Sequence, residues 1–168
     1  MAAPSTKTTR IQVLLFGVLV PALLAVLWPS VLAASGITLE ALLERGRVPS
    51  DLVITYTAMH PLYGGTVIEV HGDGLALRTS RRRGGRQDEI RQTTVSDADL
   101  LRLVDLLVEE RAWEQQVPDR QAVPDEGKAS LDVQIAGHDG GFWEWYNDMG
   151  ETDRLLRISA LMSEMVPR

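Results

Sequence analysis

Three histidines are the first residues that could act in catalysis or bind a metal. They are His60, His71 and His138. None of them stands four residues from another, and the chain has no HExxH motif, so their spacing matches no known metal site. His71 precedes Gly72-Asp73 and His138 precedes Asp139, which is typical of polar residues at hairpin ends. The histidines therefore give no catalytic residue, and we expect no metal and no cofactor.

Five arginines are concentrated in one short stretch of the chain. They are Arg78, Arg81, Arg82, Arg83 and Arg86. Guanidinium groups bind carboxylates and phosphates through paired hydrogen bonds, so this arginine cluster suits an anionic polymer, a lipid headgroup or an acidic protein. The alternative is a solvated loop that binds nothing. The sequence leaves both interpretations open, and the cluster is the main binding candidate.

A second candidate is the aromatic run Phe142-Trp-Glu-Trp-Tyr146. Adjacent strand residues face opposite sides, so one face holds both tryptophans and the other holds Phe142, Glu144 and Tyr146. Burying Glu144 without a hydrogen-bonding partner would cost on the order of several kcal/mol of folding free energy. We therefore predict a three-residue turn at 138–140 that buries the tryptophans. Phe142 and Tyr146 then point outward and, with Tyr63, are binding candidates.

The alternative for this strand is an exposed tryptophan platform for sugar rings or a peptide. A two-residue turn would produce that arrangement, because a shift of one residue moves every side chain to the other face.

Catalytic signatures are otherwise missing from the sequence. There is no cysteine, no GxSxG motif, no phosphate-binding loop and no dinucleotide fingerprint. Carboxylate pairs such as Asp132 with Glu144 exist, but a glycosidase needs a defined separation across a cleft. The sequence therefore leans against an enzyme. The alternative is a hydrolase of an envelope polymer that uses His60 or His71 with an acidic partner.

Charge is distributed unevenly along the 168 residues, which carry a formal net charge of −6. Lys7 and Arg10 are the only charged residues before Glu40, so the remainder holds 15 of the 17 basic residues against 23 acidic ones, a balance of −8. An acidic domain repels phosphate backbones, so nucleic acid is not an expected partner.

Residues 1–34 have the layout of an export segment. Two basic residues precede an uncharged apolar run from Ile11 to Trp28. If uncut, residues 11–33 reach roughly 34 Å as a helix, enough for a hydrocarbon core of about 30 Å, with Trp28 near the far interface. If cut after Ala33, the rest is secreted. Both alternatives keep the N-terminus inside and export the C-terminal part.

The elements behind this segment alternate in a simple order. Residues 35–50 form a connector with a short helix over 39–45, and 51–168 form a single domain. Strands are expected over 51–57, 66–71, 75–79, 89–95, 129–137 and 141–147, and helices over 96–113 and 151–165. This order predicts an α+β fold: a mostly antiparallel sheet of five to six strands with two main helices on one face, after an N-terminal hydrophobic helix.

Residues 51–147 weakly resemble a group of small exported bacterial domains of unknown function. The matching features are Thr57, the Pro61-Leu62-Tyr63 loop, Ile68, the Asp73-Gly74 turn and the Ser96 cap. Such domains often carry cysteines near the loop, and this chain has none. The resemblance implies no activity. The sequence as a whole predicts a non-catalytic extracytoplasmic domain, anchored or secreted, that binds an anionic envelope polymer or an acidic protein.

Overall fold

The computed structural model describes residues 39, 41, 44–82, 88–115, 120–121 and 123–167. The predicted export segment lies outside these residues, as do Arg83 and Arg86. No helix in the described part is long and apolar enough to cross a membrane. The described connector positions between 39 and 45 are helical, and Gly46 follows with a φ of 60°, so the predicted helix ends where a left-handed glycine is available.

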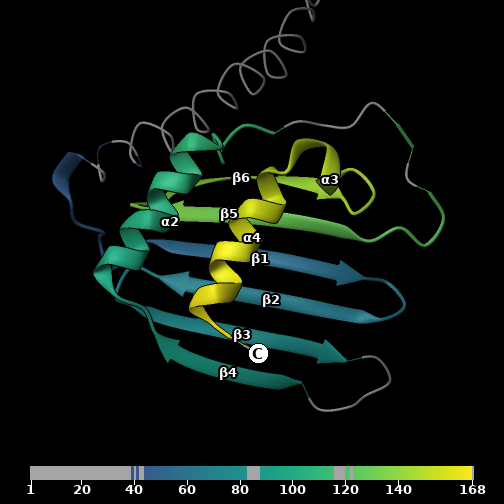
Figure 1. Cartoon of the computed structure of the whole chain (residues 1–168), viewed down its shortest axis with the longest axis horizontal. Coiled ribbons are helices and arrows are strands. Elements are labelled where there is room, and N and C mark those ends of the chain that lie inside the picture. Colours follow the sequence, from purple (N-terminus) through teal and green to yellow (C-terminus); the bar gives the residue numbers. More distant parts are fainter. Residues whose placement is uncertain are drawn as a thin grey trace, which may run out of the picture.

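Six strands form one antiparallel sheet in the order β4-β3-β2-β1-β5-β6 (Figure 1). The strands are β1 (Val53–His60), β2 (Gly64–His71), β3 (Leu75–Arg82), β4 (Glu89–Thr94), β5 (Lys128–Ile135) and β6 (His138–Trp145). The first four make a meander, and the β5–β6 hairpin joins the sheet beside β1. The predicted antiparallel α+β fold is confirmed.

Beyond the connector, the described residues form three helices: α2 (Asp97–Glu109) between β4 and β5, and α3 (Met149–Thr152) and α4 (Arg154–Met165) after β6. Figure 1 shows α2 and α4 lying across the same face of the sheet. Ser96 begins α2 as predicted, because its side chain accepts a hydrogen bond from the Asp99 amide at 3.2 Å. The single closing helix predicted over 151–165 is instead two helices, since Asp153 has a left-handed φ of 56°.

The core lies between the sheet and these helices. Every second strand residue points toward α2 and α4, and nearly all of the apolar side chains among them are buried. They include Ile54, Ile68, Val70, Ala76, Leu131 and Val133 from the strands and Leu100, Leu103, Leu107, Leu155, Ile158 and Met162 from the helices. The apolar residues at 3–4 spacing in α2 and α4 thus pack against the apolar residues at alternate positions of the strands.

The predicted register of β6 is wrong. Ile135 pairs with His138, so the turn consists of Ala136 and Gly137 alone. Both have positive φ, 50° and 76°, the conformation of a type I′ hairpin turn. Phe142 therefore lies opposite Leu131 and is buried on the helix side, while Trp143 and Trp145 point to the other face.

Glu144 is buried at 4% exposure, against our expectation. Its Oε1 accepts a hydrogen bond from the Thr152 hydroxyl at 2.8 Å, and burial raises its pKa while Thr152 and the nearby Arg154 guanidinium oppose that rise. Arg154 lies 4.1 Å above the Phe142 ring and donates to the Glu110 carbonyl. The break between α3 and α4 supplies these partners, which the sequence did not reveal.

Candidate functional site

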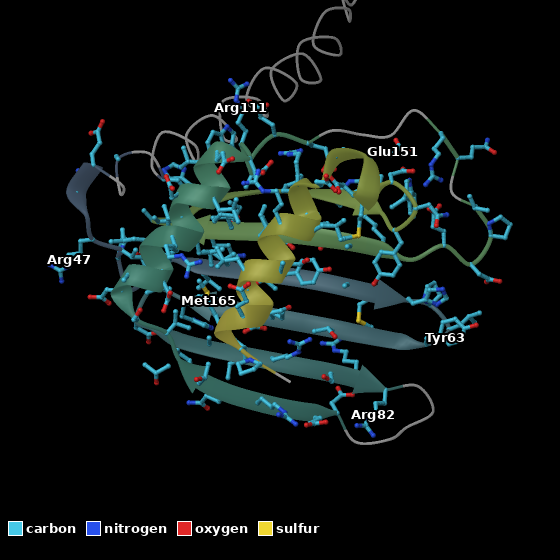
Figure 2. All side chains as sticks on the ribbon, in the orientation of Figure 1. Arg47, Tyr63, Arg82, Arg111, Glu151 and Met165 are labelled. Atoms are coloured by element: carbon cyan, nitrogen blue, oxygen red, sulfur yellow. The ribbon has the colours of Figure 1, made fainter. Side chains whose placement is uncertain are left out.

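The β1–β2 turn lies beside the end of β3 at one end of the sheet, where two arginines are exposed. In the β2–β3 pairing, Gly64 lies beside Arg82 and Gly65 beside Arg81. The β1–β2 turn, with Tyr63 at its end, is therefore adjacent to the end of β3. Figure 2 shows Tyr63 and Arg82 at the same end of the sheet. We call Tyr63, Arg81 and Arg82 the basic tip.

Tyr63 is the most exposed large apolar side chain among the described residues, at 73%. The His60 ring lies 4.5 Å from it, and His60 Nδ1 accepts a hydrogen bond from the Leu62 amide at 3.0 Å. Gly64 follows with a φ of 82°, and a Cβ there would collide with the Arg81 carbonyl. Glycine thus lets the turn approach β3 and holds Tyr63 near the arginines.

The tip arginines are only weakly engaged by the protein. Arg81 is exposed, and Arg82 contacts Glu89 at 3.4 Å. Glu89 is held more closely by Arg91, at 2.7 Å, and the hydrogen bond from Arg91 is the main cause of its lowered pKa. Exposed ion pairs of this kind contribute little to stability. An anionic ligand could therefore recruit Arg82 at little cost.

Arg78 lies apart from the other predicted arginines. It is 7% exposed on the helix-covered face, and its Nη1 donates to the Val166 carbonyl at 3.1 Å. Side-chain alternation along β3 separates it from Arg81, which points to the opposite face. The contact with Val166 gives Arg78 a role at the C-terminal end of α4, so the structure brings Arg81 and Arg82 to the tip without it.

The two tryptophans lie on the face of the sheet that the helices leave uncovered, which we call the open face. Their rings are 5.2 Å apart in an edge-to-face arrangement. Lys128 Nζ lies 4.0 Å above the Trp143 ring, a close cation–π contact. Lys128 pairs with both Met59 and Trp145, which places this group at the same end of the sheet as the basic tip.

The other predicted aromatic contacts are not at the surface. Phe142 is 3% exposed under Arg154. Tyr146 is half-buried against Gly127, and burial raises its pKa. Of the three aromatic candidates, only Tyr63 is strongly exposed. The outward position of Trp143 and Trp145 matches the alternative that the sequence left open, and the Ala136-Gly137 turn is the signal that would have favoured it. The sequence did not indicate Lys128.

The candidate catalytic groups do not converge. Asp132 is exposed on the open face, whereas Glu144 is buried on the helix side, so that carboxylate pair is divided by the sheet. His71 lies 3.7 Å from Glu69, and both are partly exposed on the open face. No described group of histidines and carboxylates could hold a metal ion.

An open depression lies between the connector and the start of α2. Its lining includes Arg45, Asp73 and Asp97 but no histidine. Asp73 accepts a hydrogen bond from the Leu75 amide at 3.0 Å, and Asp97 lies in the first turn of α2. Both carboxylates therefore stabilise local structure, and this depression adds no candidate for chemistry.

A scan against protein-family models finds no match, and a search of curated proteins finds none either. The case for function therefore depends on the geometry described above.

Proposed function

We propose that the chain is a non-catalytic extracytoplasmic domain, anchored or secreted, that binds an anionic polymer of the cell envelope through the basic tip. The observation that carries the proposal is the pairing of Gly64 and Gly65 with Arg82 and Arg81. It brings the turn with the exposed Tyr63 next to the end of β3, where Arg81 is exposed on the open face and Arg82 on the helix side.

This combination suits a polymer of acidic sugars. An aromatic ring stacks on the apolar face of a sugar, and guanidinium groups bind carboxylate or phosphate oxygens in pairs. An acidic protein offers the same charge but no repeated rings, so Tyr63 favours the polymer.

The position of the connector also favours a polymer over the headgroups of the protein's own membrane. The Leu52 amide bonds the Pro49 carbonyl, and the Gly72 amide bonds the Leu52 carbonyl. These contacts place residues 49–52 at the β2–β3 turn, the opposite end of the sheet from the tip. A domain tethered through its N-terminal side would present the tip away from its tether.

The first test compares two full-length variants with equal charge changes. The tip variant combines Arg81→Gln, Arg82→Gln and Tyr63→Ala, and the control combines Arg102→Gln and Arg111→Gln, both exposed arginines near α2. We expect co-sedimentation with purified insoluble cell wall to fall at least tenfold for the tip variant at low salt, because the ring and both charges are lost. The control should bind like the original chain.

Equal binding by the tip variant and the original chain would refute the proposed site. Loss of binding after protease treatment of the wall fraction would instead identify an acidic protein as the partner.

Export is tested separately, by fractionation of the expressed chain followed by mass measurement. An intact chain in the membrane fraction would indicate an anchor, and a mass lacking residues 1–33 would indicate a secreted domain. Recovery of the intact chain in the cytosol would contradict the proposed location.

A further inference from the structure

The open face carries both apolar and polar side chains, and no helix or strand of the described structure covers it. Antiparallel sheets commonly place polar residues on a face exposed to water. Here eight of the outward positions are apolar: Val53, Met59, Val67, Leu75, Leu77, Ile90, Trp143 and Trp145. Ile90 is 68% exposed, and the others are partly buried by their neighbours. Apolar side chains on an uncovered sheet face make that face a candidate interaction surface.

Strand pairing arranges the open face in rows that run across the sheet. The middle row carries no charge and consists of Trp143, Ser130, Thr57, Val67, Thr79 and Ile90. The next row toward the tip contains Lys128 and Arg81. The next row on the other side contains Asp132 and Glu69. Opposite charges thus flank an uncharged centre.

We infer that the open face packs against the open face of a second copy of this chain. The two-fold axis runs between the two sheets and parallel to both. It is perpendicular to the strands and follows the middle row. Such an axis reverses the strand direction, so the basic row of each copy faces the acidic row of the other. The middle rows then face each other, and Trp145 lies opposite the partner's Gly141, where there is room for a large ring.

The size of the sheet fits this arrangement. Six strands about 4.8 Å apart and about eight residues long at about 3.3 Å per residue cover roughly 750 Å² per copy. A standard interface buries about 800 Å² per partner. Two sheets packed face to face at about −30° would form a sandwich with the helices outside. The reversal leaves the two basic tips at opposite ends of the dimer, and Arg81 belongs both to a tip and to the interface.

The test is the mass of the full-length chain, in detergent if it fractionates with membranes, measured by light scattering during size exclusion. We expect a dimer for the original chain and a monomer for Thr57→Arg, because the central strand would then bring two buried guanidinium groups together. The matched control is Leu156→Arg, since Leu156 is 42% exposed on α4, and it should remain dimeric. Lys128→Glu should weaken the dimer and Lys128→Glu with Asp132→Lys should restore it.

A second readout does not depend on variants that alter packing. The chain has no cysteine, so Thr57→Cys introduces a single thiol. A short bis-maleimide should link two copies of Thr57→Cys but not two copies of Leu156→Cys. A monomeric original chain, or a Thr57→Arg chain that stays dimeric and a Thr57→Cys chain that does not cross-link, would overturn the inference.

Discussion

At the scale of single residues, burial of charge depends on partners that come from elsewhere in the chain. Glu144 is tolerated on the helix side because Thr152 and Arg154 lie over it. Arg120 shows the same principle in a loop. Its guanidinium bonds Glu126 at 2.6 Å and Asp148 at 2.9 Å, and Glu126 has a side chain only 2% exposed. These contacts join the loop before β5 to the segment after β6.

The Arg120–Glu126 contact predicts a specific loss of stability in acid. The hydrogen bond from Arg120 is the main cause that lowers the pKa of Glu126 from 4.5 to about 2. A carboxyl group whose pKa is lower in the folded than in the unfolded chain stabilises the folded state. This stabilisation is complete above the pKa of the unfolded chain and is lost as the pH falls from 4.5 toward 2. The melting temperature should therefore fall across that window.

Glu126→Gln should melt lower than the original chain at pH 7 and show a weaker pH dependence between pH 4.5 and 2. Glu114→Gln, which changes an exposed carboxylate, is the control. Thermal melts followed by circular dichroism at several pH values measure both effects. An unchanged pH dependence in Glu126→Gln would show that other carboxylates govern acid unfolding.

At the scale of elements, the β5–β6 turn decides which side chains face the solvent. Ala136 adopts a left-handed φ of 50°, which is unfavourable for alanine, and its amide donates to Asp51 at 3.1 Å. The burial of Phe142 in the core, which this turn makes possible, compensates for the unfavourable conformation of Ala136. Gln115 supports the same hairpin at its outer edge, since its side chain accepts from the Trp143 amide and donates to the Trp143 carbonyl.

This strain predicts a stabilising substitution. Ala136→Asn should raise the free energy of unfolding by about 1 kcal/mol, because asparagine adopts the left-handed conformation more readily than alanine. Ala136→Val should lower it, since a β-branched residue is poorly accommodated at positive φ. Urea denaturation of the three chains provides the comparison. A more stable valine variant would mean that the turn does not adopt the I′ conformation.

At the scale of the whole molecule, exposed acidic and basic residues lie at opposite ends of the sheet. Exposed Asp51, Asp73 and Asp139 lie at the end of the sheet near the connector, and the basic tip lies at the other end. The open face carries the apolar surface. The proposed ligand and the inferred dimer share Arg81 and otherwise use different residues, so Tyr63→Ala with Arg82→Gln tests the ligand and Thr57→Arg tests the dimer independently.

The sequence by itself determined the elements, because strand alternation, the apolar spacing of the helices and the Ser96 cap are local signals. It also indicated Tyr63, Arg81 and Arg82, which are exposed in the structure. Only the tertiary structure decided which face of β6 is buried and that Arg78 belongs to the helix side. The physical reason is that a one-residue turn difference reverses every side chain of a strand, and the partners that allow Glu144 to be buried come from α3 and α4, which meet β6 only in the folded chain.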